Sequence, residues 1–306
     1  MYTDYDAIII GSGCAGLAAG IYTSRAGLST LIIEKKTAGG ELMNRQMIEN
    51  YPGFTEGIMG PALGSAMLEQ ASNFGAELQV GEIVSIQNKA GCLMVKTEDD
   101  TRTCRGVILA MGSFPRELKV PGEAELQNKG VFYCATCDGP QLAGKPVVVA
   151  GAGDSGITEA LHLERLGCTV TVVELMPQPK ASRVLLERAE ENPRIEVMCG
   201  QKITAITGDD WVTGVDLEDA ATGETKHLDV QGILVRIGQV PNTRFLEDIL
   251  ELTPAGQIPV DESLQTALPG IFAAGDIRQY SPMQVSTAVG DGVSAAMALG
   301  RYLASN

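Results

Sequence analysis

The chain has 306 residues, which is enough for about two domains of ordinary size. Its 38 acidic and 23 basic residues give a formal net charge of -15, which repels phosphate backbones and anionic lipid and argues against nucleic acid or a membrane as a partner. Apolar runs end well short of the roughly 20 residues that a membrane span needs. Because the N-terminus carries acids where a secretory signal carries lysine or arginine, we expect a cytoplasmic protein.

The first predicted unit is a strand, a glycine turn, a helix and a second strand, in "YDAIIIGSGCAGLAAGIYTSRAGLSTLIIEK". Gly11 would form the tight turn, Gly13 would let the backbone approach a pyrophosphate, and Gly16 would let the helix pack on the strand. Glu34 ends the second strand, where it can accept hydrogen bonds from an adenosine ribose. The pattern predicts a dinucleotide site.

Further along, "VILAMGSFPR" (107–116) reads as a short apolar strand that delivers Gly112 to a loop. "LPGIFAAGDIRQ" (268–279) has the same form and delivers Gly275 and Asp276, close to a closing helix predicted from Met283 to Leu303. An aspartate in this place is more often a helix cap than a ligand.

Between these segments, "FYCATCDGP" (132–140) places Cys134 and Cys137 three positions apart. A zinc site needs four ligands, but the chain has one such pair and two isolated histidines, His162 and His227. A purely structural pair is the other alternative. We favour a redox disulfide, because a CxxC loop leading toward a helix can lower the pKa of one thiol and supply a thiolate for disulfide exchange.

The segment "KPVVVAGAGDSGITEALHLERLGCTVTVVEL" repeats the N-terminal pattern, with Gly151, Gly153, Gly156 and Glu174 in the same relative positions. One glycine loop alone would be weak evidence. Two copies in register predict two dinucleotide cofactors that exchange electrons, and the later segments fit a flavin for the first.

With these motifs in view, the chain resembles the low-molecular-weight thioredoxin reductases over essentially its whole length. The matching motifs are "GSGCAG", "IENYPGF", "AMGSFPR", "VPGE", "CATCDG", "GAGDSG", "IGQVPNT" and "GIFAAGD". The resemblance implies an α/β fold with two Rossmann-like, three-layer β/β/α domains, the second inserted in the first. Residues 1–115 and 245–306 would bind FAD, and 116–244 would form the inserted nicotinamide-type domain with the cysteine pair. The stretch from Glu82 to Met111 would add a small sheet to the first domain.

The resemblance also implies roles for single residues. Cys137 would face the flavin in a charge-transfer contact, Cys134 would attack the disulfide of thioredoxin or a similar protein, and Asp138 would exchange a proton with the leaving thiolate. No metal is implied, and the family forms homodimers. The implied FAD residues are Gly11, Gly13, Cys14, Ala15, Gly16, Glu34, Gly40, Glu41, Asn50, Gly112, Gly275, Asp276, Met283 and Gln284.

The sequence departs from that family after the second acidic strand. NADPH-using members carry a histidine and several arginines there, whereas "ELMPQPKAS" (174–182) offers only Lys180, and Glu174 would repel a 2′-phosphate. We therefore expect an atypical member that uses NADH. The alternative is that Gly151, Gly153, Gly156 and Glu174 are vestigial and that electrons come from ferredoxin, as in some relatives.

On the flavin side, Cys14, Glu41 and Met283 replace residues that are usual in the family, with effects that the sequence does not assign. Two other functions stay open at this point. One is a dithiol oxidase that passes electrons through the flavin to oxygen, and the other is a flavin-bound redox sensor that signals by conformation. An intact second glycine loop favours the reductase over the sensor.

Overall fold

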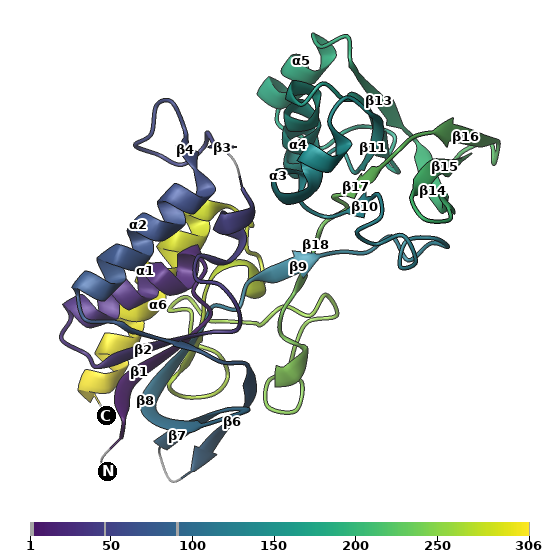
Figure 1. Cartoon of the computed structure of the whole chain (residues 1–306). Helices are drawn as coiled ribbons and strands as arrows, with labels where there is room; N and C mark the ends of the chain where they lie inside the picture. The colour runs from purple at the N-terminus through teal and green to yellow at the C-terminus, as the bar shows by residue number, and fades with distance from the viewer. Residues whose placement is uncertain (1–2, 46, 90–91, 306) are drawn as a thin grey trace. The chain divides into compact units, whose positions relative to one another are not determined.

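The computed structural model describes residues 3–45, 47–89 and 92–305, and the chain divides into two compact units. Met1–Phe114 and Val240–Asn306 form the first unit, and Pro115–Gln239 form the second (Figure 1). The second unit is therefore inserted in the sequence of the first. The chain crosses between the units in β9 (Ser113–Pro115) and β18 (Gln239–Pro241), which pair with each other.

A seven-stranded sheet forms the centre of the first unit. Its order is β5 (Glu77–Val80), β2 (Thr30–Glu34), β1 (Tyr5–Ile10), β8 (Thr101–Leu109), β7 (Cys92–Thr97) and β6 (Ile83–Lys89), with β19 (Ile271–Ala273) also paired to β8. The strands β5, β2, β1, β8 and β19 are parallel neighbours. By contrast, β7 pairs antiparallel with the first half of β8, and β6 pairs antiparallel with β7. Residues 90–91, within the predicted small sheet, lie outside the described residues.

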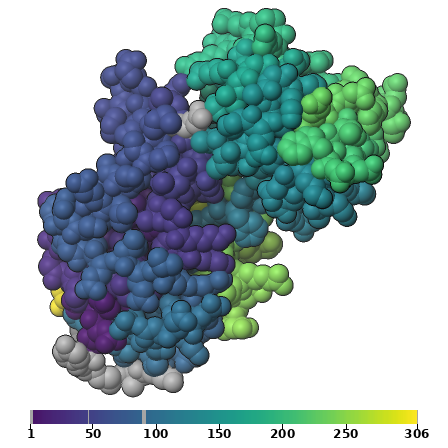
Figure 2. Space-filling model, viewed as in Figure 1, coloured from purple at the N-terminus to yellow at the C-terminus, as the bar shows by residue number. Residues whose placement is uncertain are grey.

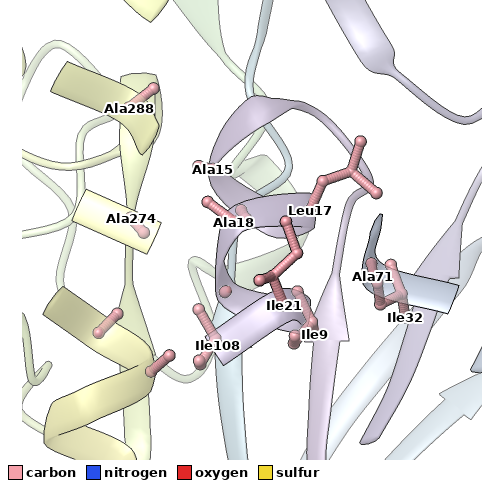
Figure 3. Packing of buried hydrophobic residues seen from close by; sticks show 14 of the residues in the cluster. Ile9, Ala15, Leu17, Ala18, Ile21, Ile32, Ala71, Ile108, Ala274 and Ala288 are labelled. Atoms are coloured by element: carbon pink, nitrogen blue, oxygen red, sulfur yellow. The ribbon is translucent and has the colours of Figure 1, made fainter. Parts of the chain in front are cut away.

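One face of this sheet is covered by α1 (Cys14–Arg25), α2 (Gly60–Asn73) and α6 (Val285–Ser305). Figure 3 shows the core at close range, with side chains from the strands and all three helices. A glycine in α6 sets the spacing between α1 and α6, because a Cβ on Gly292 would lie 2.1 Å from the carbonyl oxygen of Ala15. The two helices thus pack almost backbone to backbone at the start of α1.

The predicted closing helix is displaced by two residues. It begins at Val285 and not at Met283, since Met283 has a φ of 55°, in the left-handed region that a right-handed helix excludes. Met283 and Gln284 are therefore in the loop that leads into α6.

The second unit has a fully parallel sheet in the order β10 (Val131–Phe132), β17 (Ile233–Val235), β11 (Pro146–Ala150), β12 (Thr169–Glu174) and β13 (Ile195–Cys199). Its strands are almost entirely apolar in the middle of the sheet, because both faces are covered. On one face lie α3 (Ala135–Asp138), α4 (Asp154–Arg165) and α5 (Arg183–Glu190).

The other face is covered by the antiparallel sheet β14 (Gln201–Gly208), β15 (Val212–Asp219) and β16 (Thr225–Asp229). In Figure 2 this sheet forms one flank of the second unit's surface, in green. The remaining pieces are the hairpin β3 (Met47–Ile48) and β4 (Ile58–Met59) and the 3-10 turns η1 (Gly40–Asn44), η2 (Gly139–Leu142), η3 (Arg244–Leu246) and η4 (Gly275–Ile277). The predicted fold class of two Rossmann-like units, the second inserted in the first, is confirmed. The second unit has a helical layer and a separate β layer, whereas in the first unit β6 and β7 belong to the same sheet as the parallel strands.

Candidate active site

The glycine loop of the first unit leaves room for a ligand at one position only. A Cβ on Gly11 would lie 2.4 Å from the oxygen of Ala110, and one on Gly16 would lie 1.8 Å from the oxygen of Gly11. At Gly13, by contrast, a Cβ would meet none of the described atoms within 4 Å. Gly13 is also the N-cap of α1. The N–H groups of the first turn therefore border open space, which is what a pyrophosphate requires.

The carboxylate of Glu34 is held beside this loop by hydrogen bonds from Ser12 and Lys36. Its Oε2 accepts hydrogen bonds from the backbone N–H (2.8 Å) and the hydroxyl (2.7 Å) of Ser12, and its Oε1 accepts one from the N–H of Lys36 (3.1 Å). A carboxylate has room for further donors on both oxygens. Glu34 is thus placed at the end of β2 where a ribose hydroxyl could also donate.

Several other residues predicted for the flavin lie around the same loop. A Cβ on Gly40 would be 3.0 Å from the Cα of Gly13, and one on Gly275 would be 3.0 Å from the Cβ of Ala15. Gly112 has a φ of 64° in the loop that follows β8. Gly40 and Gly275 thus keep two separate chain segments close to the start of α1.

The polar residues of the predicted set form two local groups. Asn50 donates from Nδ2 to Oε1 of Gln284 at 3.0 Å, which joins the first third of the chain to the loop before α6. Glu41 accepts from Nδ2 of Asn44 at 3.4 Å, within η1. Met283 is 37% exposed, and its N–H donates to the hydroxyl of Ser281.

Burial changes the acidity of two groups at the start of α1 and after β19. The pKa of Asp276 is raised, chiefly because burial disfavours its charged form, although the hydroxyl of Ser113 donates to it at 3.4 Å. Burial, together with the nearby charge of Asp276, raises the pKa of the Cys14 thiol to about 11. Cys14 is therefore a neutral thiol near neutral pH and behaves as a small apolar residue.

An ion pair that the sequence did not reveal supports this loop. Asp291 of α6 accepts from the N–H of Gly275 (3.1 Å) and from Nε (2.6 Å) and Nη2 (3.0 Å) of Arg278. The forked pair ties η4 to the helix that follows it. An acid between two glycines on the apolar face of α6 was the available signal, but helical spacing does not reveal its partner.

The second unit repeats the glycine geometry. A Cβ on Gly151 would lie 2.3 Å from the oxygen of Arg236, and one on Gly156 would lie 1.9 Å from the oxygen of Gly151. Gly153 again borders space that is free of described atoms within 4 Å. Glu174 accepts from the N–H groups of Ala152 (2.8 Å) and Met176 (2.9 Å). This loop therefore fits a dinucleotide as well as the first one does.

The stretch after Glu174 folds back onto the glycine loop. The N–H groups of Lys180 and Ala181 donate to the oxygen of Ala152 at 3.0 and 3.1 Å, and that of Ser182 donates to Oδ1 of Asp154 at 2.6 Å. The Lys180 side chain is exposed. The loop is thus held mainly by its backbone, and a carboxylate, not a cluster of arginines, lies at the end of β12.

Cys134 and Cys137 are joined by a disulfide at the start of α3, with their Cα atoms 5.4 Å apart. Cys134 is the N-cap of this helix, and its sulfur accepts a hydrogen bond from the N–H of Cys137 at 3.1 Å. Cys137 is exposed and Cys134 is half-buried. A Cβ on Gly139 would lie 2.9 Å from Leu166, so the turn after the pair packs closely against the end of α4.

Asp138 follows Cys137 directly and is half-buried. Burial raises its pKa above the ordinary value of an aspartate. Its N–H donates to the oxygen of Cys134 at 3.0 Å. The carboxyl group thus retains a proton to higher pH than an exposed aspartate does, next to a sulfur pair that exchanges protons whenever it is reduced.

Within the described ranges, no group of three or more histidine, cysteine or acidic side chains is arranged to hold a metal ion. No helix in the described part of the chain is long and apolar enough to cross a membrane.

Comparison with known proteins identifies the family. Residues 5–292 match the family model of pyridine nucleotide-disulphide oxidoreductases. The chain is 43% identical to the thioredoxin reductase of Mycolicibacterium smegmatis, covering 99% of this chain and 97% of the relative. It is 40% identical to the thioredoxin reductase of Bacillus subtilis, covering 98% and 95%.

Solved structures agree with these relatives. The crystal structure of Lactococcus lactis thioredoxin reductase matches with a TM-score of 0.97 at 37% identity, covering 99% of this chain and 100% of that one. The predicted resemblance is confirmed, and membership implies an oxidoreductase that uses FAD and a pyridine nucleotide. With two dinucleotide loops and a CxxC disulfide in one chain, this protein belongs to the pyridine nucleotide-disulphide oxidoreductase family.

Proposed function

We propose that this protein is a flavin-dependent thioredoxin reductase that takes electrons from NADH. The observation that carries the proposal is the Cys134–Cys137 disulfide at the start of α3, in a unit that also holds a second intact glycine loop. Relatives with about 40% identity over the whole chain are thioredoxin reductases, which supports thioredoxin or a similar protein as the partner.

The residues around Gly13 and Glu34 would hold FAD, and those around Gly153 and Glu174 would hold NADH. When bound and reduced by two electrons from NADH, FAD would pass those two electrons to a disulfide. The two electrons and two protons convert the Cys134–Cys137 disulfide into two thiols. The N–H of Cys137, which already donates to the sulfur of Cys134, would stabilise a thiolate there.

The reduced pair then exchanges with the partner in two steps. The Cys134 thiolate attacks one sulfur of the partner's disulfide, so that a mixed disulfide forms and the partner's other sulfur leaves as a thiolate and takes up a proton. Cys137, as a thiolate, attacks Cys134 in the mixed disulfide. The internal disulfide forms again, and the partner is released with two thiols.

Asp138 is proposed to supply the proton to the leaving thiolate. We expect Asp138→Asn to slow thioredoxin reduction by on the order of 10²-fold, the usual contribution of a positioned acid. Because the carboxyl must be protonated to act, the wild-type rate should fall as the pH rises through the raised pKa of Asp138. The pH–rate profile of the variant should lack this decrease. Single-turnover reduction of thioredoxin by the pre-reduced protein, followed across pH, measures both. A variant that keeps the wild-type rate and profile would exclude this role.

Glu174 is proposed to select NADH. We expect Glu174→Gln to weaken NADH binding roughly tenfold, since a charge-assisted hydrogen bond becomes a neutral one, and to improve NADPH binding because like-charge repulsion is lost. The measurement is the rate of flavin reduction against the concentration of each nucleotide. Glu196→Gln, an exposed change on the neighbouring strand β13, is the matched control. The idea fails if the wild-type protein prefers NADPH.

The test of the whole proposal is anaerobic mixing of the flavoprotein with NADH, NADPH or reduced ferredoxin, followed by addition of thioredoxin. Bleaching by NADH and stoichiometric appearance of thioredoxin thiols are expected. Bleaching only by reduced ferredoxin would overturn NADH as the donor while leaving thioredoxin reduction intact. Oxygen consumption with a dithiol, in the absence of thioredoxin reduction, would instead favour the oxidase.

A further inference from the structure

A buried ion pair lies next to the second glycine loop and has no part in the reaction described above. Arg236 follows β17 directly, and its Nη2 donates to Oε1 of Glu159, in α4, at 2.5 Å. The side chains are only 2% and 6% exposed. Two charges taken out of water in this way are expensive to bury unless their remaining donors and acceptors are also satisfied.

The guanidinium of Arg236 is only partly satisfied by the described residues. Its Nε and Nη1 are buried, and no acceptor among the residues at 3–45, 47–89 and 92–305 is within hydrogen-bond reach of either. Buried donors without partners are rare in native proteins because each one loses its hydrogen bonds to water. Such donors call for an acceptor that the described residues do not supply.

The register of the sheet places Arg236 between the two functional loops. In the register of the sheet, Leu234 of β17 is paired with Phe132 of β10 on one side and with Val149 of β11 on the other. Because the three strands are parallel, the residues two positions later, Cys134, Arg236 and Gly151, all lie at the carboxyl edge of the sheet. The carbonyl oxygen of Arg236 would lie 2.3 Å from a Cβ on Gly151, which shows how closely this residue adjoins the glycine turn.

The strand order of this sheet indicates the direction in which a bound dinucleotide would run across its edge. Glu174 ends β12, on one side of β11, whereas β17 and β10 lie on the other side. An adenosine ribose on Glu174 and a pyrophosphate at Gly153 leave the nicotinamide half to extend over the end of β17. Arg236 is the residue at that end, and its side chain is on the α4 face because it bonds Glu159.

We propose that Arg236 is a binding residue for the nicotinamide half of a pyridine dinucleotide. Its Nε and Nη1 donate to an acceptor oxygen on that half, a phosphate or carboxamide oxygen, while Glu159 holds the guanidinium in place. This inference rests on the part of the proposed function that assigns a pyridine nucleotide to the second glycine loop. It adds a specific contact on the side of the loop that faces the cysteine pair.

The test compares NAD⁺ with AMP, which has only the adenosine half, by titration calorimetry on the oxidised flavoprotein, where no turnover occurs. Arg236→Lys keeps the positive charge but lacks the planar set of guanidinium donors. The double variant Arg236→Met with Glu159→Gln removes both charges, so that neither is left buried without its partner. We expect both to raise the Kd for NAD⁺ at least tenfold and to leave the Kd for AMP within twofold. Arg194→Lys, an exposed change at the amino-terminal edge of the same sheet, should alter neither.

Thermal unfolding of each variant checks that the fold is retained. Equal weakening of NAD⁺ and AMP, or no weakening of either, would overturn the inference and leave Arg236 as a structural ion pair, with a buried water as the missing acceptor. Absence of NAD⁺ binding by the wild-type protein would also overturn it. Thioredoxin reduction by dithionite-reduced wild-type protein is measured separately, so a failure of the reductase function is distinguished from a failure at Arg236.

Discussion

Cys134→Ser and Cys137→Ser are each expected to lower thioredoxin reduction by more than about 10³-fold, because each removes one sulfur of a pair that acts as a unit. Flavin reduction by NADH should persist in both, since neither cysteine belongs to the glycine loops that would hold the cofactors. The two variants should differ in one respect. Cys137→Ser keeps the attacking thiol and should trap a mixed disulfide with thioredoxin, whereas Cys134→Ser should not.

The measurement is the stopped-flow appearance of thioredoxin thiols, together with non-reducing electrophoresis for the trapped complex. Cys92→Ser, which changes a half-buried thiol of β7 in the other unit, is the matched control and should behave as wild type. If Cys134→Ser traps the complex and Cys137→Ser does not, the assigned roles of the two cysteines are reversed. Activity retained in both variants would contradict a dithiol mechanism.

The glycine loops could be predicted from sequence because their requirements are local. Gly11 and Gly16 are constrained by backbone atoms only a few residues away or on the neighbouring strand, so a strand, a glycine pattern and a helix suffice to identify them. Glu34 and Glu174, at the ends of β2 and β12, could also be predicted, because each lies at the same distance along the chain from the first glycine of its loop. The CxxC pair was likewise visible as a sequence motif.

The buried ion pairs could not be predicted in the same way. Arg236 and Glu159 are 77 positions apart, and Arg278 meets Asp291 across the loop that precedes α6. Each pair depends on which strands are neighbours and on how a helix lies across them, and neither periodicity nor spacing carries that information. The start of α6 was predicted two residues too early for a related reason. Met283 has a left-handed backbone, but it is not a glycine, the residue that usually marks this conformation in a sequence.

Gly13→Ala and Gly16→Ala should separate cofactor binding from folding. A methyl group at Gly16 would meet the backbone oxygen of Gly11 at 1.8 Å, and neither group can move without shifting β1 or α1. We expect Gly16→Ala to destabilise the first unit by about 3 kcal/mol or more, the upper range for an overpacked core. Chemical denaturation monitored by circular dichroism would measure this loss.

At Gly13 a methyl group would point into space without described atoms within 4 Å, so Gly13→Ala should fold with nearly unchanged stability. That same space is needed for the pyrophosphate, and we expect flavin affinity to fall on the order of 10²-fold, about 3 kcal/mol of steric conflict. Gly153→Ala, the equivalent change in the second unit, is the control: it should keep the flavin and lose NAD⁺ binding. If Gly13→Ala retains flavin as tightly as Gly153→Ala does, the open space at the start of α1 is not where the flavin's phosphates bind.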